Sequence, residues 1–343
     1  MPVNDAIHAI HENQVLSRWA ALLPRPPAQV GAVHQTDAEL VDLGDGRLLA
    51  LTVDALIEEV AAGLFQDPFT AGRTAVIASV SDLSAVGADP IGLLLCVTLP
   101  GDDAAVQEAV ARGVREACEA AGTFVLGGDT NDGPQLEISV TAAGMVPADG
   151  YHSRMGMAAG DRVYASGPLG AGAALAASAL LHTPAELYSE TDYRPMPRLA
   201  EGRALRGVAS ATMDTSDGLL ATIDQLARLN GVAVDVEADP ASLLEPGAAR
   251  LAGALGLPPV AFLAAHHGEF ELVFSIRPDR VEALEAAAAA IGWTPLFLGT
   301  AREGAGVRVG GRELDLVRIR NLLHDVGGDP QAYVAGLLGI VGG

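Results

Sequence analysis

Three short stretches of the sequence place an aspartate where an apolar run ends. They are Ser81-Asp82, Gly127-Gly128-Asp129-Thr130 and Asp214-Thr215-Ser216-Asp217-Gly218, and no basic residue follows any of them directly. A desolvated and unpaired carboxylate costs on the order of several kcal/mol, so each must be solvated or bound to a positive partner. Three such carboxylates from distant parts of one chain indicate a shared hard cation, Mg²⁺ or Ca²⁺. Because Mg²⁺ keeps coordination positions for water and phosphate oxygens, the pattern predicts a metal-nucleotide site.

Two of the three stretches also have a plain structural explanation. Asp82 taken alone could be a hydrogen-bonded helical aspartate, and the Asp214 stretch could be a helix N-cap, where Ser and Asp are preferred. An N-cap accounts well for one of those polar residues and poorly for three. The glycine pair before Asp129 is a stronger signal, because glycine permits close contacts and backbone shapes that other residues forbid.

Periodicity and turn residues predict the elements that carry these motifs. Helices are expected over residues 70–86, 102–122 and 280–291, with another that starts at the Asp214–Gly218 cap and runs to Asn230. Strands are expected over residues 38–43, 47–53, 91–99, 123–126, 136–146, 162–166, 232–236 and 272–276, which leaves Gly127 to Thr130 in a loop. Residues 167–172 form a Gly-rich loop that is either a phosphate cradle or a tight turn.

The order of these elements predicts two α+β units, in which helices cover one face of each sheet. Residues 1–30 form a polar helical lead-in that ends in prolines, and residues 148–150 form a linker-like turn. We therefore expect an N-terminal domain over residues 31–148 and a C-terminal domain over residues 149–343. A chain of 343 residues is long enough for two cores.

Composition excludes several classes of function. The formal net charge is −22, which argues against a nucleic-acid partner. The chain has no Lys, and all 21 of its basic residues are Arg, so a Lys-based P-loop, a Schiff base and a Lys general base are excluded. No apolar run reaches the roughly 18 residues of a membrane span, and no signal pattern opens the chain. We expect a cytoplasmic protein without a membrane partner, in which Cys96 and Cys118 are small buried hydrophobes.

Taken together and in this order, the motifs resemble those of thiamine-monophosphate kinases, a branch of the PurM-like superfamily of aminoimidazole-ribonucleotide-synthetase relatives. Residues 80–90 resemble the family's Asn-Leu-Ser-Asp-x-Ala-Ala-Met-Gly-Ala-x-Pro motif, and residues 126–134 resemble its Gly-Gly-Asp-Thr-x-x-Gly-Pro loop. Residues 213–219, 193–198 and 268–272 resemble its Asp-x-Ser-Asp-Gly-Leu, Arg-Pro-x-Pro-Arg and Gly-Glu-Asp-Tyr-Glu-Leu elements. The resemblance implies a two-domain α/β (α+β) fold that dimerises through its N-terminal sheet and binds ATP between the domains.

The resemblance also implies a site for ATP, Mg²⁺ and a small-molecule acceptor. The implied Mg²⁺ ligands are Asp37, Asp82, Asp129 and Asp214. The implied nucleotide-binding residues are Gly127, Gly128, Thr130, Ser216, Asp217 and Arg154, and the implied acceptor residues are Asp54, Phe270 and Glu271. Asp129, Asp217 and Arg154 are the implied catalytic residues. Phosphoryl transfer needs positioning and charge neutralisation more than a covalent group, so metal-binding carboxylates and one arginine would suffice.

The chain departs from the family mostly on the acceptor side. The family's Gly-Asp-Asp-x-Ala motif is Gln-Thr-Asp-Ala-Glu over residues 35–39, so one metal carboxylate is missing unless Glu39 replaces it. The acceptor segment Val-Glu-Gly-Val-His-Phe is Ile-Glu-Glu-Val-Ala-Ala over residues 57–62, without its His. The family's Gly-Gly-Glu-Asp-Tyr is His-His-Gly-Glu-Phe over residues 266–270, and its aromatic C-terminal segment is not recognisable after Asp315.

Three hypotheses follow from the sequence. The first is an ATP- and Mg²⁺-dependent phosphotransferase, a homodimer whose best single acceptor is thiamine monophosphate. The second is a relative that uses ATP to activate an amide or carboxyl oxygen, and the third is a nucleotide-binding protein that has lost catalysis. His266 and His267 could bind substrate or a transition metal, or could be polar loop residues.

Overall fold

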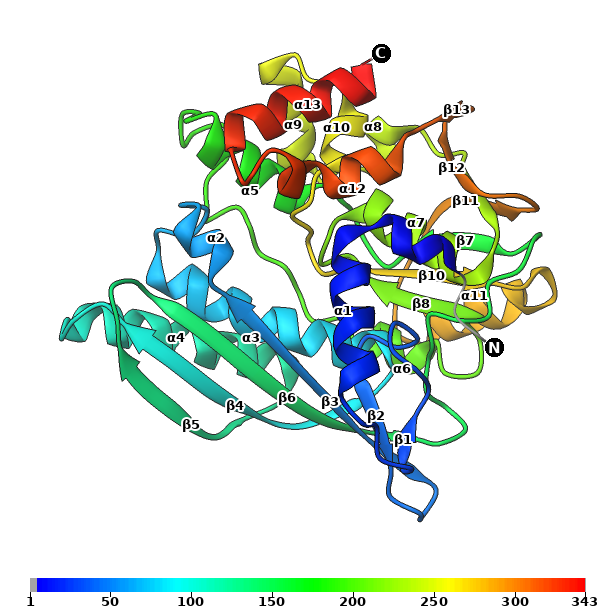
Figure 1. The fold of residues 1–343 in the computed structure, drawn as a ribbon, viewed down its shortest axis with the longest axis horizontal. Helices are drawn as coiled ribbons and strands as arrows, with labels where there is room; N and C mark the ends of the chain where they lie inside the picture. Colours follow the sequence, from blue (N-terminus) through cyan, green and yellow to red (C-terminus); the bar gives the residue numbers. More distant parts are fainter. Residues whose placement is uncertain (1–4, 343) are drawn as a thin grey trace.

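The computed structural model describes residues 5–342 and contains two β-sheets, each with helices packed against it (Figure 1). The first four residues of the predicted lead-in and the last residue of the chain lie outside the described part. The N-terminal sheet has six strands in the order β1-β2-β3-β6-β4-β5, and the C-terminal sheet has seven in the order β13-β12-β9-β11-β7-β10-β8. This is the mixed α/β two-sheet architecture that the sequence predicts.

The N-terminal sheet carries two long helices on one face. Its strands are β1 (Gln29–Val30), β2 (Glu39–Asp42), β3 (Arg47–Leu56), β4 (Asp89–Leu99), β5 (Val125–Asp132) and β6 (Glu137–Pro147). Burial alternates along β6, as expected for a strand with one packed face. The helices are α3 (Pro68–Ala85) and α4 (Ala104–Ala121), and the short helix α2 (Glu58–Ala61) precedes them. The other face of the sheet exposes apolar side chains, including Leu51, Val53 and Leu94.

Helix α3 brings one functional residue to the boundary between the two sheets. Asp67 caps its N-terminus by accepting hydrogen bonds from the backbone amides of Phe69 and Thr70, and Pro68 occupies the first turn. Glycines let α3 and α4 approach closely: a Cβ at Gly113 would lie 2.0 Å from the carbonyl oxygen of Phe69. The last turn of α3 contains Asp82 and contacts strand β8 of the second sheet.

The C-terminal sheet is antiparallel except between β9 and β12. Its strands are β7 (Arg162–Ala165), β8 (Ala211–Asp214), β9 (Ala233–Val236), β10 (Leu272–Ile276), β11 (Leu296–Arg302), β12 (Gly306–Val309) and β13 (Arg312–Glu313). The helices of this part are α5 (Ala171–Leu180), α6 (Leu199–Ala204), α7 (Leu219–Asn230), α8 (Pro240–Leu243), α9 (Pro246–Leu255), α10 (Pro259–Ala264), α11 (Val281–Ala290), α12 (Leu316–Asp325) and α13 (Pro330–Gly342). Strand β8 is one of the two edge strands, and it ends at Asp214.

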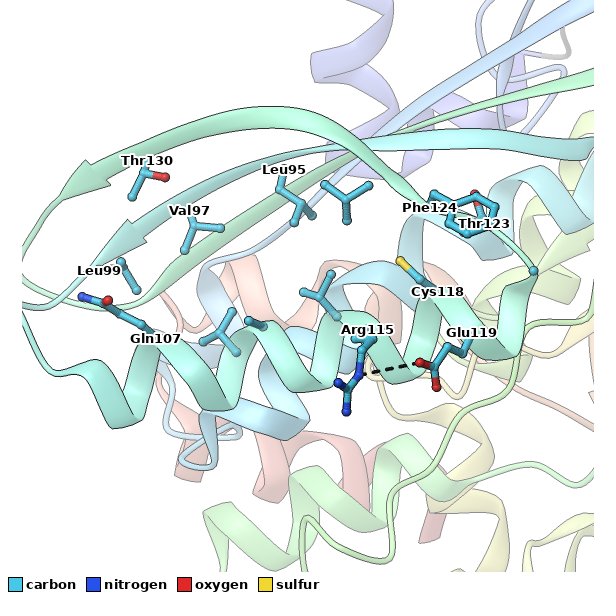
Figure 2. Close-up of a pocket in the computed structure, with 15 residues that line it drawn as sticks. Leu95, Val97, Leu99, Gln107, Arg115, Cys118, Glu119, Thr123, Phe124 and Thr130 are labelled. Carbon is cyan, nitrogen blue, oxygen red and sulfur yellow. Dashed lines mark ion pairs between the residues drawn. The ribbon is translucent and has the colours of Figure 1, made fainter.

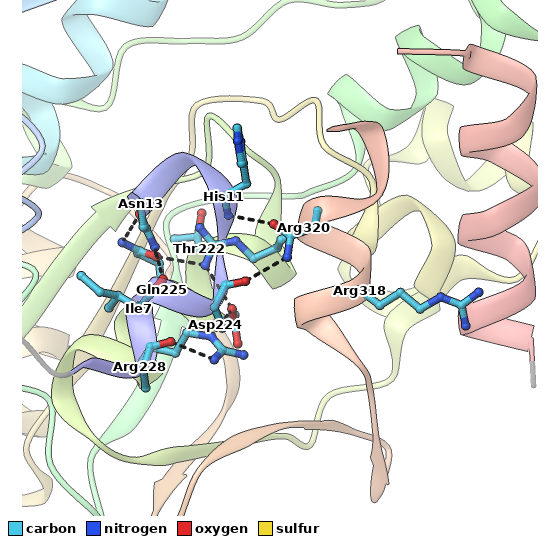
Figure 3. A network of polar contacts seen from close by, with 12 residues as sticks. Ile7, His11, Asn13, Thr222, Asp224, Gln225, Arg228, Arg318 and Arg320 are labelled. Carbon is cyan, nitrogen blue, oxygen red and sulfur yellow. Dashed lines mark hydrogen bonds and ion pairs between the residues drawn. The ribbon is translucent and has the colours of Figure 1, made fainter. Parts of the chain in front are cut away.

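The N-terminal helix α1 (His11–Leu22) is attached to the C-terminal part through polar contacts (Figure 3). The buried side chains of Asn13 and Gln225 exchange hydrogen bonds of 2.9 and 3.2 Å, which joins α1 to α7. Next to them, Asp224 is ion-paired with Arg228 at 2.7 Å and with Arg320 of α12 at 3.0 Å. The amide hydrogen bonds thus join α1 to α7, and the ion pair with Arg320 joins α7 to α12. Each buried charge is stable only because it is paired.

Two local predictions were wrong, and a third was met in part. Gly127 to Thr130 lie in strand β5 and not in a loop. The helix expected from the Asp214–Gly218 stretch to Asn230 is observed as α7, with Gly218 at its N-cap; no side chain caps it, and Asp214 itself ends β8. Cys96 is exposed, because β4 has one open face, whereas Cys118 is buried as expected. Within residues 5–342, no helix is long and apolar enough to cross a membrane.

Candidate metal-nucleotide site

Three of the four predicted metal ligands converge where the two sheets meet. Asp37 precedes β2, Asp82 lies in the last turn of α3, and Asp214 is the final residue of β8. Each contributes a carboxylate oxygen, and the three oxygens all lie within 4.8 Å of one another. Carboxylate oxygens are the ligands that Mg²⁺ prefers, so the donor set fits the predicted metal.

Hydrogen bonds fix the orientation of these carboxylates. Arg154 donates to Asp37 from Nη2 at 2.8 Å and from Nε at 3.2 Å. Ser81 donates to one oxygen of Asp214 at 2.6 Å, and Ser216 donates to the other at 3.1 Å. Asp82 accepts a hydrogen bond from Thr52 of β3. One guanidinium group therefore faces three carboxylates, which leaves excess negative charge in the cluster.

This excess charge changes the acid-base behaviour of the cluster. Burial, followed by the repulsion of Asp54, Asp214 and Asp37, raises the pKa of Asp82 well above its usual range. Burial and the charge of Asp37 likewise raise the pKa of Asp214 to about 7. A divalent cation at the three oxygens would remove the repulsion, so both shifts agree with a metal site.

Two more predicted residues lie near the cluster. Asp54 is on β3, and its Oδ2 is buried without a hydrogen-bond partner among the described residues. Burial raises the pKa of Asp54, and the charges of Asp37 and Asp217 add to that effect. Asp217 follows β8 in the same stretch as Asp214. Asp54 is thus close enough to both Asp37 and Asp217 to feel their charges, so the acidic region reaches from the cluster toward α7.

The Gly127–Thr130 stretch is not part of this cluster within one chain. Asp129 is exposed on β5, where it accepts a 3.3 Å hydrogen bond from Asn131 on the open face of the sheet. Strands β6 and β4 separate β5 from β3, and Asp82 lies on the helix-covered face. Thr130 lines a cleft of about 850 Å³ between β5 and α4 (Figure 2). The metal and nucleotide roles of this stretch remain predictions.

The glycine before Asp129 has a packing reason. A Cβ at Gly128 would lie 1.8 Å from the carbonyl oxygen of Leu95 on the neighbouring strand β4. Any other residue at this position would force β5 away from β4. Glycine here is therefore explained by strand pairing without a nucleotide.

Two predicted acceptor residues are buried inside the C-terminal part. Glu271 is buried, forms an ion pair with Arg198 and accepts a hydrogen bond from Ser166. Phe270 is also buried and has a positive φ of 60°. Their proposed contacts with the acceptor remain predictions.

Glu39 does not replace the missing metal carboxylate. Its side chain is half exposed and ion-paired with Arg25 at 2.9 Å, and it also accepts a hydrogen bond from Gln29. The suggestion that it substitutes in the metal site is therefore wrong.

One charged residue near the site was missed by the sequence analysis. The nearby charge of Asp217, followed by burial, raises the pKa of Glu12 on α1. Helix α1 therefore contributes a carboxylate to the surroundings of Asp217. No local pattern marks Glu12, because its position depends on how α1 docks on α7 and α12.

Comparison with known proteins agrees with this fold. Residues 35–146 match the family model described as AIR synthase related protein, N-terminal domain. The two-sheet fold and this match thus place the chain in an ATP-utilising protein class, the PurM-like relatives of AIR synthase. A thiamine-monophosphate kinase of Halobacterium salinarum is 34% identical over 75% of this chain and 85% of its own length. The chain belongs to the thiamine-monophosphate kinase branch of the AIR synthase-related family.

Other relatives and solved structures show the same relationship. A thiamine-monophosphate kinase of Salmonella typhimurium is 34% identical over 60% of this chain, and the match spans 66% of that enzyme. The structure described as AaThiL complexed with AMPPCP and TMP is 25% identical, has a TM-score of 0.74, and covers 90% of this chain and 96% of its own. Escherichia coli HypE, a hydrogenase maturation protein, is 24% identical with a TM-score of 0.67 over 89% of this chain and 98% of its own, which shows the fold alone.

Proposed function

We propose that this protein is a cytoplasmic, homodimeric, ATP- and Mg²⁺-dependent phosphotransferase whose acceptor is thiamine monophosphate. The observation that carries the proposal is the cluster of Asp37, Asp82 and Asp214, which joins the two parts of the chain in one site. The similarity to thiamine-monophosphate kinases supports the choice of acceptor.

The proposed reaction forms a bond between a phosphate oxygen of the acceptor and the γ-phosphorus of ATP. The bond between that phosphorus and the β,γ-bridging oxygen breaks, and ADP leaves. Mg²⁺ would supply neutralisation of the phosphate charge in this reaction. The three aspartates would hold the metal and so set the position of the phosphates, while Ser81, Ser216 and Thr52 keep the carboxylates oriented.

Arg154 is the candidate for contact with the transferred phosphoryl group. Its guanidinium is anchored by two hydrogen bonds to Asp37, so it is positioned at the cluster before any ligand arrives. Burial lowers its pKa, but the charge and hydrogen bonds of Asp37, together with the charges of Asp82 and Asp214, raise the pKa above its usual range, and the group therefore stays charged. A planar guanidinium suits bidentate contact with phosphate oxygens, which explains how the site can work without a lysine.

The nucleotide and acceptor roles carried over from the family complete the proposal. Ser216 and Asp217 would lie beside the phosphates, and Asp54, Phe270 and Glu271 would lie on the acceptor side. The structure solved with AMPPCP and TMP supports this arrangement, because a similar chain there holds a nucleotide analogue and a second small molecule together.

The open face of the N-terminal sheet supports the proposed homodimer. Leu51, Val53 and Leu94 are 37%, 64% and 50% exposed on it, and apolar patches of this kind mark association surfaces. Asp129 lies on the same face. A dimer formed through this face would place Gly127, Gly128, Asp129 and Thr130 at the subunit boundary, where we propose that they contact the nucleotide.

Incubation with ATP, Mg²⁺ and thiamine monophosphate, followed by mass analysis of the products, tests the proposal. We expect thiamine diphosphate and ADP in equal amounts. Free phosphate with a dehydrated or cyclised product would support activation of an amide or carboxyl oxygen instead. Binding of Mg²⁺ and ATP without turnover of any acceptor would support the nucleotide-binding protein that has lost catalysis.

A further inference from the structure

A cleft of about 850 Å³ separates helix α4 from the outer strands β4 and β5 of the N-terminal sheet (Figure 2). Helix α4 packs closely against α3 but not against β4 or β5. The side chains of Leu95, Val97 and Leu99 on β4 line the cleft and are therefore only partly buried. The volume falls within the range of about 300–1,000 Å³ that is typical of pockets for small molecules.

The cleft is elongated, and its middle is apolar. Val110, Val114 and Cys118 follow one another at helical spacing on α4 and line the cleft opposite the leucine and valine side chains of β4. The lining residues of this helix and its C-cap run from Gln107 to Gly122, which is roughly 22 Å at the helical rise of about 1.5 Å per residue. An apolar channel of this length suits an extended aliphatic chain better than a compact ring.

One end of the cleft contains a buried hydroxyl group without a partner. Thr123 lines this end beside Phe124 and is only 3% exposed, and its Oγ1 has no hydrogen bond to any described residue. Its backbone amide donates to the carbonyl oxygen of Cys118 at 2.9 Å, which holds the residue against the end of α4. Burial of an unpaired hydroxyl is unfavourable, so a ligand with a hydrogen-bonding group would supply the missing partner.

The lining of the cleft has no net charge. Among the described residues that line it, Arg115 and Glu119 are the charged ones, and they form an ion pair of 3.6 Å at the solvent side of α4 (Figure 2). Burial raises the pKa of the Cys118 thiol, which therefore stays neutral. The net charge of the chain, −22, also disfavours an anionic ligand. The cleft thus fits a ligand whose polar group is uncharged.

The cleft is separate from the cluster of Asp37, Asp82 and Asp214. None of these aspartates lines it, and β4 and β6 lie between β5 and the strand β3 that contacts the cluster. Thr130 is the one residue of the predicted nucleotide-binding set that lines the cleft. A ligand in the cleft therefore needs neither the metal nor ATP, and this inference does not depend on the proposed function.

We propose that the cleft between α4 and β5 binds a linear aliphatic molecule with an uncharged hydrogen-bonding end group, such as a long-chain alcohol. The end group pairs with the hydroxyl of Thr123, which can donate or accept a hydrogen bond. The chain lies between the apolar residues of α4 and those of β4. Each methylene that it buries contributes about 0.8 kcal/mol, which corresponds to about fourfold in affinity.

Calorimetric titration of the full-length protein with 1-octanol, without nucleotide or metal, tests the proposal. We expect saturable binding of one molecule per chain, and 1-decanol should bind roughly tenfold more tightly because it buries two more methylenes. Octanoate has a chain of the same length but a charged end group, and it should bind at least about tenfold more weakly than 1-octanol. Absence of saturable 1-octanol binding would overturn the proposal, and equal binding of octanoate would overturn the uncharged end group.

Two tryptophan variants on α4 locate the bound alcohol. Ala111 is exposed and lines the cleft, so Ala111→Trp fills the cleft without disturbing the core and should weaken 1-octanol binding by about tenfold or more. The matched control is Ala120→Trp, at an exposed position of the same helix that does not line the cleft, and it should bind 1-octanol as the wild type does. Wild-type affinity in Ala111→Trp would show that the alcohol binds elsewhere and would overturn the proposal.

Thr123→Val tests the hydrogen bond, and light scattering tests a second copy as the occupant. The valine keeps the shape of the side chain and removes the hydroxyl, so 1-octanol should bind about fivefold more weakly while the Tm of the free protein does not fall. An unchanged affinity would show that Thr123 does not bind the end group. If 1-octanol does not bind and Ala111→Trp converts a dimer into a monomer, the cleft is an interface between two copies and the proposal is wrong.

Discussion

Replacement of Asp214 by Asn should make the free protein more stable while removing its response to Mg²⁺. Asp214 is buried among like charges, and its pKa rises from 3.8 to about 7, which corresponds to about 4 kcal/mol of cost for the charged form. Asparagine removes that cost but weakens the bond from Ser81, so the net gain near pH 8 is roughly 1–3 kcal/mol, or a few degrees in Tm.

The pH dependence gives this prediction a definite sign. The folded state holds the proton of Asp214 more tightly than the unfolded state, because the pKa of Asp214 is raised in the fold. Stability of the metal-free wild type therefore falls as the pH rises from about 4 to about 7, and Asp214→Asn should flatten this slope. Mg²⁺ should restore stability to the wild type above about pH 7 and should not do so for the variant.

Asp224 provides a matched control for this experiment. It is also a buried aspartate, but it is ion-paired with Arg228 and Arg320. Asp224→Asn should lower the Tm by leaving both guanidinium groups short of a partner, and it should leave the Mg²⁺ response intact. Thermal unfolding at about pH 5 and pH 8, with and without Mg²⁺, distinguishes the two variants. A lower Tm for metal-free Asp214→Asn at about pH 8, or an unchanged Mg²⁺ response, would refute the reasoning.

Three further predictions concern other parts of the molecule. Burial and the charge of Glu271 raise the pKa of Glu269 to about 8, so the free energy of unfolding should fall between about pH 5 and pH 8. Glu269→Gln should reduce this fall in urea titrations. An unchanged dependence of the unfolding free energy on pH would contradict this cause. Val53→Asp, at a position 64% exposed on the open sheet face, should convert a dimer into a folded monomer in light-scattering measurements, and a dimeric variant would exclude this face. Asp129→Asn should lower turnover by about a hundredfold or more while leaving the Tm within about 1 °C, since the side chain is exposed; wild-type turnover would refute its role.

The sequence predicted the long elements well because their burial follows a simple period. Helix α3 was expected over residues 70–86 and is observed as Pro68–Ala85, and strands β2 and β3 are observed where strands were expected over residues 38–43 and 47–53. Strand β5 was predicted incompletely, because glycine and aspartate are typical of turns and the pairing of β5 with β4 is a long-range contact. Cys96 was misplaced because an apolar run cannot show that one face of β4 stays open.

The candidate site was predictable only in part. The resemblance placed Asp37, Asp82 and Asp214 in one site, and the structure brings them together. The hydrogen bonds from Ser81 and Thr52 were not predicted, because they depend on how the two sheets meet. The same limit applies to the unpartnered Oδ2 of Asp54, since a sequence shows which polar residues are present but not which lack partners.

A manganese soak tests the central claim most directly, because Mn²⁺ takes the oxygen ligands of Mg²⁺ and is visible by anomalous scattering. Crystals of the wild type with Mn²⁺ and AMPPCP should show an anomalous peak coordinated by Asp37, Asp82 and Asp214. The peak should be absent in Asp214→Asn crystals of the same form. A fully occupied nucleotide whose metal ions touch none of the three carboxylates would contradict the account.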